Sequence, residues 1–250
     1  MKRIDSELVE RGLCESREKA QRAIMSGAVR INGQVARKPS DQVRPADLIE
    51  ITAGEKYVSR GGLKLEKALD HFEIQTSGAV AIDIGSSTGG FTDCLLQRGA
   101  TQVYAVDVGK GQLAWKLRQD PRVVVMEGVN ARSLTIAQLP AAFDGADLVT
   151  IDCSFISLQR IVPAAVALLR PGGTMVALVK PQFEAGKAEA DRGAGVIRDP
   201  EVHRRVLQQI EVFIKDQPAL NWRGVIESPI LGPAGNKEYL AIIEKGEKQR

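Results

Sequence analysis

Residues 79–91 read AVAIDIGSSTGGF, an apolar run that leads into a glycine-rich turn. The apolar run predicts a buried strand, and the glycines at 85, 89 and 90 predict a tight turn into a helix. Their spacing differs from the Gly-x-Gly-x-x-Gly pattern of nicotinamide and flavin sites, and the Gly-Lys-Ser/Thr ending of a phosphate loop is missing. The stretch therefore predicts a strand, turn and helix that bind a ligand without a pyrophosphate or triphosphate group.

Two carboxylates flank this turn in the predicted fold. Asp83 precedes the turn, where a carboxylate can meet an ammonium group or orient the turn backbone. Asp107 ends the next predicted strand, 22 residues after Gly85, where an acid that accepts both ribose hydroxyls belongs. Asn130 follows the third predicted strand and either contacts an adenine or caps the next turn. This order of strand, acid, turn, helix, strand and acid predicts an S-adenosylmethionine site.

Strands and helices alternate through the rest of the chain. Apolar runs predict strands over residues 79–85, 101–108, 122–128, 147–155 and 172–181. Helical patterns lie at residues 63–72, 90–98, 111–119, 158–170 and 200–216. The alternation predicts a Rossmann-like α/β fold, in which a mainly parallel sheet has helices on both faces. Two last strands, 222–230 and 238–245, have no helix between them and predict an antiparallel edge.

The first 52 residues have a different pattern and predict a small α+β domain. An apolar stripe from Ile4 to Leu13 predicts one helix, and Ser16 fits the N-cap of a second. Asn32-Gly33 stands between two short alternating runs, which is a strong hairpin signal, and residues 47–52 predict a closing strand. We expect residues 53–60 to be a linker and residues 61–250 to form the second domain.

The formal net charge of +3 is unevenly distributed. Residues 1–60 hold 12 lysines and arginines against 9 acids, whereas residues 61–250 hold 22 of each. Such asymmetry can mark a nucleic-acid-binding part, although an excess this small also arises by chance. No run of 18 apolar residues predicts a membrane span, and the charged first residues argue against a secretory signal. With three cysteines and two histidines we expect neither disulfides nor a metal, and a cytoplasmic protein.

Polar residues stand at further strand ends. Asp152 and Lys180 each end a predicted strand, so both should face the crevice beside the glycine-rich turn. Glu238 begins the last strand and Lys64 lies in the helix before the first one. These two either converge on the same site or form surface salt bridges. Cys153 is interpreted as a small buried side chain rather than a nucleophile, because no histidine accompanies it.

Several segments resemble one known family. Residues 3–43 resemble the RNA-binding domain of ribosomal protein small-subunit number four, a module that recurs in RNA-modifying enzymes. The family resemblance rests on YVSRGGLKL, DIGSSTGGFTDCLLQRGA, DCSFISL, VKPQFEAGK and SPILGPAGNKEYL. These segments are similar to the TlyA family, which joins that module to an FtsJ-like methyltransferase domain and has also been labelled haemolysin. The resemblance implies methyl transfer from S-adenosylmethionine to a ribose 2′-hydroxyl of cytidine in ribosomal RNA.

The resemblance also implies roles for individual residues. An FtsJ-like catalytic tetrad falls on Lys64, Asp152, Lys180 and Glu238. Cofactor binding falls on Asp83, Gly85, Ser86, Gly89, Gly90, Phe91, Asp107, Val108 and Asn130. Candidate phosphate contacts on RNA are Arg3, Arg11, Arg17, Lys19, Arg22, Arg30 and Lys38. In the implied mechanism a neutral Lys180 takes the hydroxyl proton, the two acids position the lysines, and Lys64 helps to hold the ribose or Lys180.

Other functions remain open at this point. A membrane-lytic protein would need an insertable segment, and neither a long apolar run nor a strongly amphipathic basic helix is present. A ribosome-binding factor with a vestigial cofactor pocket would not need the tetrad. A small-molecule methyltransferase would leave residues 1–50 without a purpose. The partner is expected to be ribosomal RNA or a ribosomal subunit, with large-subunit RNA favoured by the short basic tail, and the oligomeric state is undetermined.

Overall fold

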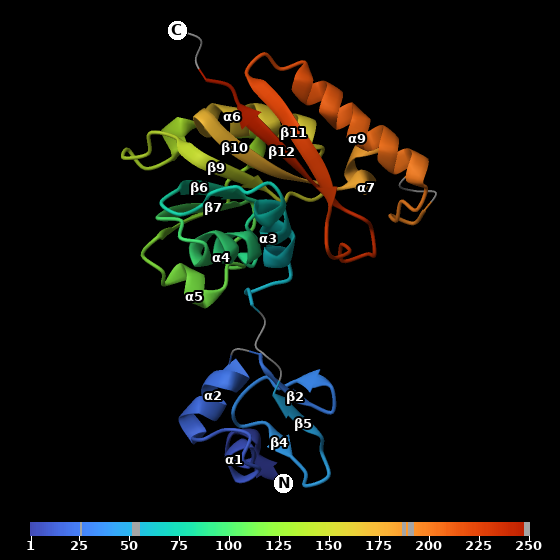
Figure 1. Cartoon of the computed structure of the whole chain (residues 1–250). Helices are drawn as coiled ribbons and strands as arrows, with labels where there is room; N and C mark the ends of the chain where they lie inside the picture. The colour runs from blue at the N-terminus through green and yellow to red at the C-terminus, as the bar shows by residue number, and fades with distance from the viewer. Residues whose placement is uncertain (26, 52–55, 187–188, 190–192, 248–250) are drawn as a thin grey trace. The chain divides into compact units, whose positions relative to one another are not determined.

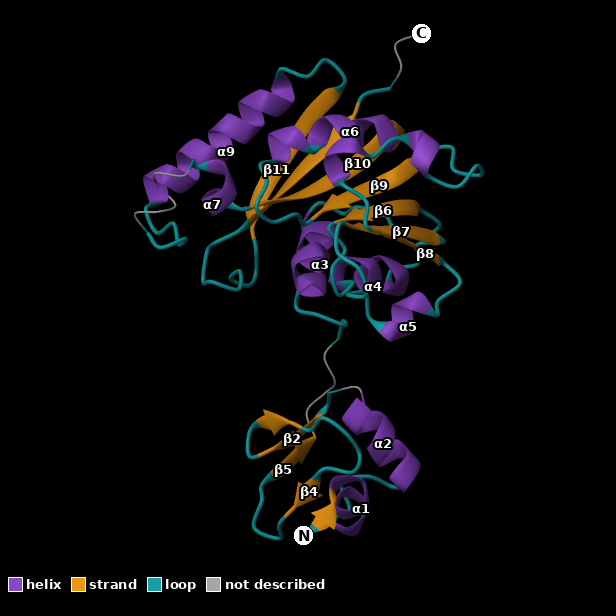
Figure 2. Ribbon diagram, turned by 180° about the vertical axis from the view of Figure 1, so that it is seen from behind, coloured by secondary structure: helices purple, strands orange, loops and turns teal. Residues whose placement is uncertain are grey.

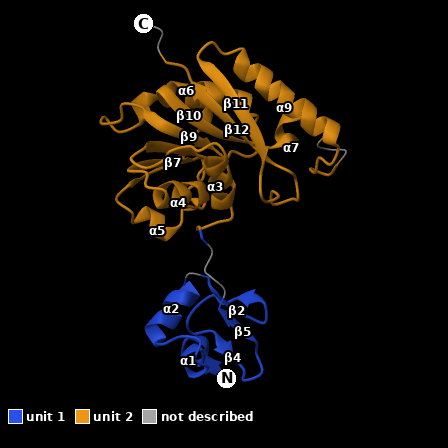
Figure 3. Ribbon diagram, viewed as in Figure 1, with its two compact units in different colours: residues 1–56 blue, residues 57–250 orange. Residues whose placement is uncertain are grey.

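The computed structural model describes residues 1–25, 27–51, 56–186, 189 and 193–247. The chain divides into two compact units, Met1–Lys56 and Tyr57–Arg250, drawn in blue and orange in Figure 3. We call them unit 1 and unit 2 and describe each by itself.

Unit 1 combines helices with short strands (Figure 1). Its elements are β1 (Lys2–Arg3), α1 (Ile4–Glu10), α2 (Arg17–Met25), β2 (Val29–Ile31), β3 (Gln34–Val35), β4 (Gln42–Val43) and β5 (Ile49–Ile51). Ile4 and Leu8 lie four residues apart on one face of α1 and pack with Ile24 of α2 in the core. Asn32 and Gly33 have positive φ values of 50° and 80°, which suits a two-residue hairpin turn between antiparallel β2 and β3. The predicted hairpin is confirmed.

Unit 2 is built on a seven-stranded sheet in the order β11-β12-β10-β9-β6-β7-β8. The strands are β6 (Val80–Ile84), β7 (Gln102–Asp107), β8 (Val123–Glu127), β9 (Ala146–Ile151), β10 (Leu169–Val179), β11 (Leu220–Glu227) and β12 (Tyr239–Lys245). Neighbours from β8 to β10 pair in parallel, whereas β12 pairs antiparallel with both β10 and β11. The predicted mainly parallel sheet with an antiparallel edge is confirmed.

Helices cover both faces of this sheet (Figure 2). They are α3 (Gly61–His71), α4 (Gly90–Gln97), α5 (Trp115–Arg118), α6 (Val162–Leu168), α7 (Pro181–Glu184) and α9 (Pro200–Lys215). Leu69, Leu95 and Leu117 place α3, α4 and α5 in one apolar cluster. Leu168 and Ile210 place α6 and α9 in another. The inner strands are thus buried on two sides, which is why they read as continuous apolar runs, whereas the edge strands β8 and β11 are only partly buried.

Two predicted helices are shorter than their sequence pattern suggested. Of residues 111–119 only Trp115–Arg118 is helical, because Gly111 has φ 73° and Pro121 disfavours helical geometry in the residue before it. Of residues 158–170, a 3-10 turn (Leu158–Arg160) and α6 are separated by Ile161. The chain then turns into β10 at Leu169, whose backbone pairs with β9. Pairing with the sheet therefore ends the helix earlier than the apolar pattern predicts.

The start of unit 2 also differs from the expected linker over residues 53–60. Tyr57 is only 3% exposed and packs in the same apolar cluster as α3 and α4. The Val58 N–H donates a hydrogen bond of 2.8 Å to Asp93 on α4. The C-terminal end of the predicted linker is therefore part of unit 2, while residues 52–55 lie outside the described residues.

Candidate active site

The carboxyl ends of β6, β7, β9 and β10 open onto two adjoining cavities of unit 2. The first, of about 630 Å³, is lined by all four members of the predicted tetrad, and we call it the tetrad cavity. The second, of about 480 Å³, is lined by Asp107, Val108 and Asn130, and we call it the Asp107 cavity. Gly85 and Asp152 line both. Ligands of open α/β sheets bind at this edge, and here two ligand parts can meet at the end of β6.

The tetrad consists of two ion pairs. Lys64 on α3 and Glu238, just before β12, are joined by a 2.5 Å contact between Nζ and Oε2. Lys180 Nζ lies 2.6 Å from an Asp152 carboxylate oxygen and donates a 2.9 Å hydrogen bond to Ser154 Oγ. Glu238 is 1% exposed, so its charge depends on the lysine beside it. The prediction that these four residues meet at one site agrees with the geometry.

The local backbone explains why glycine stands at the turn. Gly85 has φ 83°, and a Cβ there would come within 2.5 Å of the Asp152 carbonyl oxygen. The turn after β6 thus passes directly against the end of β9, which leaves no room for a side chain. Gly89 has φ 97° and caps α4, but its missing side chain faces Leu113 and Leu117 rather than either cavity. Gly90 allows α4 to approach Ser59, and it lines the tetrad cavity with Ser86 and Phe91.

Asp83 does not line either cavity. It is 0% exposed, and its carboxylate accepts hydrogen bonds from Thr92 N, Thr92 Oγ1 and Thr150 Oγ1 at 2.9, 2.7 and 3.0 Å. Burial raises the pKa of Asp83 to about 6, since all three donors are neutral groups. In this structure Asp83 orients the turn and α4, whereas its predicted contact with a cofactor stays a prediction.

The Asp107 cavity carries the other predicted cofactor residues. The Asp107 carboxylate accepts hydrogen bonds from the backbone N–H groups of Ser87 (2.8 Å) and Gly109 (2.7 Å). Val108 is 73% exposed beside it. Asn130 accepts a hydrogen bond from Arg132 N, so it caps the following 3-10 turn, and it also lines the cavity. Both roles left open for Asn130 are therefore compatible with its position.

Sequence reasoning missed several residues that line the tetrad cavity. Phe155 is 90% exposed with φ 64°, and its ring centroid lies 5.1 Å from that of Phe183. Asn236 clamps the loop before β12 to the segment before α9, because its side chain bonds Ile197 N and Gly195 O. The signal for the two phenylalanines was available, since each follows a tetrad residue by three positions at the end of its strand.

Comparison with known proteins agrees with this geometry. Residues 57–245 match the profile of FtsJ-like methyltransferases, and residues 2–49 match that of the S4 domain. The chain belongs to the FtsJ-like methyltransferase family. A Mycobacterium tuberculosis protein named 16S/23S rRNA (cytidine-2′-O)-methyltransferase TlyA is 48% identical over 242 residues, which cover 95% of this chain and 87% of that protein. A Campylobacter jejuni protein named 23S rRNA (cytidine-2′-O)-methyltransferase TlyA is 31% identical, and the match covers 90% of this chain and 92% of that protein.

The fold of this FtsJ-like methyltransferase also occurs in solved structures. The structure of a Streptococcus thermophilus protein named as a hemolysin has a TM-score of 0.74 and 44% identity to this chain. It covers 98% of this chain, and this chain covers 88% of it. In the part of the chain that the structure describes, no helix is both long enough and apolar enough to cross a membrane.

Cys153 lines the Asp107 cavity of unit 2. Burial raises the pKa of the Cys153 thiol to about 12, so the thiol stays protonated at neutral pH. Cys153 packs against the apolar core as expected of a small filler, but it is only partly buried, so the predicted burial is not fully met. Among the described residues, no group of three or more histidine, cysteine or acidic side chains could hold a metal ion.

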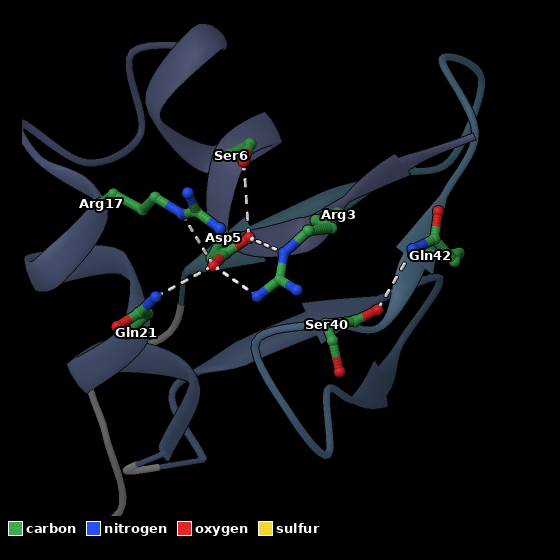
Figure 4. Close-up of polar contacts among 7 residues, drawn as sticks. All are labelled: Arg3, Asp5, Ser6, Arg17, Gln21, Ser40 and Gln42. Atoms are coloured by element: carbon green, nitrogen blue, oxygen red, sulfur yellow. Dashed lines mark hydrogen bonds and ion pairs between the residues drawn. The ribbon is translucent and has the colours of Figure 1, made fainter.

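The basic residues of unit 1 fall into different environments. Arg3 and Arg17 both bond the carboxylate of Asp5, which is 0% exposed, and Figure 4 shows their guanidinium groups converging on it. Arg11 donates to Glu7 and to the carbonyls of residues 44, 45 and 47, so it holds a turn of unit 1. The remaining candidates are exposed or partly exposed and make local contacts at most: Lys19 with Glu15, Arg22 with Glu18, Arg30 with Gly33, and exposed Lys38. Arg11 is thus the candidate most committed to the fold.

Proposed function

We propose that the chain methylates a ribose 2′-hydroxyl of cytidine in ribosomal RNA, with S-adenosylmethionine as the methyl donor. The observation that carries the proposal is the pair of ion pairs, Lys64–Glu238 and Lys180–Asp152, which line one cavity beside the Asp107 cavity. The named activity of the TlyA relatives supports cytidine and ribosomal RNA as substrate.

The residues of the Asp107 cavity fit an adenosine group. The Asp107 carboxylate ends β7 and can accept hydrogen bonds from two ribose hydroxyls, as acids at this strand end do. Val108 offers an apolar surface and Asn130 an amide for the adenine. Gly85 lines both cavities, so the two meet at the turn after β6. The cofactor, when bound, supplies the methyl group on a sulfonium, and every other contribution comes from the side chains around it.

Lys180 is the residue that we assign to the proton of the reacting hydroxyl. A ribose hydroxyl is a poor nucleophile, so an acceptor must orient its lone pair and receive its proton. Lys180 Nζ is held by Asp152 and Ser154 at the end of β10, and in its neutral form it can take that proton. The Lys64–Glu238 pair lies beside Lys180, because Glu238 precedes Tyr239 and Tyr239 pairs with Val179, and we assign it to holding the ribose. In-line placement of the reacting atoms by these side chains supplies much of the rate.

The target nucleotide enters the tetrad cavity out of its stack. Enzymes that act on nucleotides inside folded nucleic acid extrude them into a pocket. Exposed Phe155, backed by Phe183, provides an aromatic surface at the cavity on which a base can stack. We assign RNA binding to unit 1, whose exposed arginines and lysines suit phosphate contacts, and methyl transfer to unit 2.

The test maps 2′-O-methylation on both ribosomal RNAs with and without the protein, using wild type and Lys180→Ala. We expect one or more cytidines to be methylated, at a rate that Lys180→Ala lowers by about 10²–10⁴-fold. Lys215→Ala is the matched control, since Lys215 is exposed on α9 and pairs only locally with Glu211. Methylation by Lys180→Ala at the wild-type rate would exclude the assigned mechanism, and absence of any methylated ribose would exclude the function.

A further inference from the structure

One polar atom of the tetrad cavity has no partner. Among the residues that the structure describes, Gln182 Oε1 is the one buried side-chain oxygen or nitrogen without a hydrogen bond. An unpaired buried carbonyl oxygen destabilises a fold, so such an atom calls for a physical reason. Gln182 lines the tetrad cavity, where a bound ligand can supply the missing donor.

Its position relates this oxygen to the substrate rather than to the cofactor. Gln182 lies on α7, two residues after Lys180, on the β10 side of the sheet. The residues that fit adenosine follow β7 and β8, beyond β9 and β6 from this point. Gln182 and Phe183 line the tetrad cavity only, whereas Phe155 lines both cavities. The side of the site that would receive a nucleotide therefore contains an unsatisfied acceptor beside an aromatic surface.

We propose that Gln182 Oε1 reads the base of the target nucleotide by accepting a hydrogen bond from the 4-amino group of cytosine. The inference rests on the proposed function and names the residue that selects cytidine over uridine. Cytosine presents an amino donor at position 4 and an acceptor at position 3, which a glutamine amide matches with its oxygen and its nitrogen. Uracil presents a carbonyl oxygen at position 4 and an N–H at position 3, the reverse of cytosine, so both groups mismatch the amide in the orientation of this structure, where Oε1 is the buried end.

The discriminating experiment uses ribosomal subunits that carry cytidine or uridine at the mapped position, from cells without the enzyme. We expect wild type to methylate cytidine faster than uridine by about 10- to 100-fold. Gln182→Leu removes both polar ends and shortens the side chain by one atom. It should slow methylation of cytidine and bring the cytidine-to-uridine ratio close to one, with an unchanged Kd for S-adenosylmethionine.

Two further variants separate base reading from a structural role. Gln182→Glu replaces the amide by two acceptors, so it loses the donor for position 3 of cytosine and can accept from the position 3 N–H of uracil. It should slow methylation of cytidine and lower the cytidine-to-uridine ratio, which a purely structural role would leave unchanged. Gln208→Leu removes an exposed glutamine on α9 and should change neither rate nor ratio. Melting temperatures of all variants report whether each chain is folded.

The proposal is overturned if Gln182→Leu keeps the wild-type ratio, or if wild type does not prefer cytidine. It is also overturned if Gln182→Leu weakens cofactor binding while the ratio is unchanged, because Oε1 then faces the cofactor. A wild-type chain that methylates no cytidine in either ribosomal RNA overturns the proposed function itself. Failure of base reading alone leaves methylation by the wild type intact, so the two failures are distinguishable.

Discussion

Unit 1 and unit 2 each bury an aspartate, and they stabilise it in opposite ways. Asp5 in unit 1 accepts hydrogen bonds from the guanidinium groups of Arg3 and Arg17, and these hold the pKa of Asp5 well below its usual range. Asp83 in unit 2 meets only hydroxyl and backbone donors, and burial raises the pKa of Asp83 to about 6. At these two positions unit 1 meets a buried carboxylate with cations, whereas unit 2 meets it with neutral donors.

The comparison extends to the number of partners that each buried acid has. Asp5 is bonded by Arg3, Arg17 and Gln21, as Figure 4 shows, so no single partner carries its charge. Glu238 is 1% exposed and its charge is met by Lys64. Removing one of the two arginines beside Asp5 should therefore destabilise unit 1 only a little, whereas removing Lys64 should destabilise unit 2 strongly. Each of the following predictions sharpens or breaks this contrast.

The largest effect is expected for Lys64→Ala. The substitution leaves the Glu238 carboxylate buried without its cation, which should destabilise unit 2 by about 3–5 kcal/mol. Urea unfolding of the full chain measures the loss in free energy of unfolding. Hydrogen exchange of peptides from unit 2 shows whether the loss lies in that unit. Lys67→Ala on the same helix removes an exposed lysine and should cost much less. Equal losses for the two variants would mean that the ion pair is not what stabilises this wall.

A smaller loss is expected for Asp5→Asn in unit 1. The amide keeps the shape of the side chain but removes the charge that Arg3 and Arg17 share, so unit 1 should lose about 2 kcal/mol. Hydrogen exchange of peptides from α1 and α2 checks this in the full chain. Glu10→Gln removes an exposed acid that pairs with Lys2, and it should leave exchange nearly unchanged. Unaltered protection in Asp5→Asn would refute the structural role of the cluster.

The smallest effect is a difference in pH dependence between the two aspartates. The folded-state pKa of Asp83 lies above the unfolded value of 3.8, so its contribution to stability is complete below 3.8 and is lost as pH rises through about 6. Acidification from pH 7 to pH 5 should stabilise wild type relative to Asp83→Asn by about 1 kcal/mol. The pKa of Asp5 is lowered, so its contribution is present above 3.8 and falls away only below that value.

Chemical denaturation of wild type, Asp83→Asn and Asp5→Asn at pH 7, 6 and 5 tests this difference. The Asp83→Asn chain should lack the gain on acidification that wild type shows. The Asp5→Asn chain should show the same gain as wild type over this range, because Asp5 does not titrate there. Parallel pH curves for wild type and Asp83→Asn would contradict the role of burial at Asp83.

Much of unit 2 was predictable because its signals are local. Each strand is an apolar run, and the turn after β6 needs glycine where φ is positive, so the chain order alone shows a Rossmann-like sheet. Asp152 and Lys180 were predictable as neighbours, because adjacent parallel strands bring their ends together. The extents of α5 and α6 were not predictable. A proline after α5 and the pairing of Leu169 with the sheet end these helices earlier than their apolar periodicity predicts.

The sequence by itself determined the order of the elements, the hairpin at Asn32-Gly33, the glycine turn and the kinds of side chain at the strand ends. These depend on backbone preferences and on the short periods of helix and strand. Only the tertiary structure decided that Lys64 meets Glu238, 174 residues away, that Asp83 orients a helix, and that the Gln182 oxygen is left unpaired in the tetrad cavity. Burial, pairing and unsatisfied hydrogen-bonding groups depend on what packs around a side chain, and no local pattern encodes that.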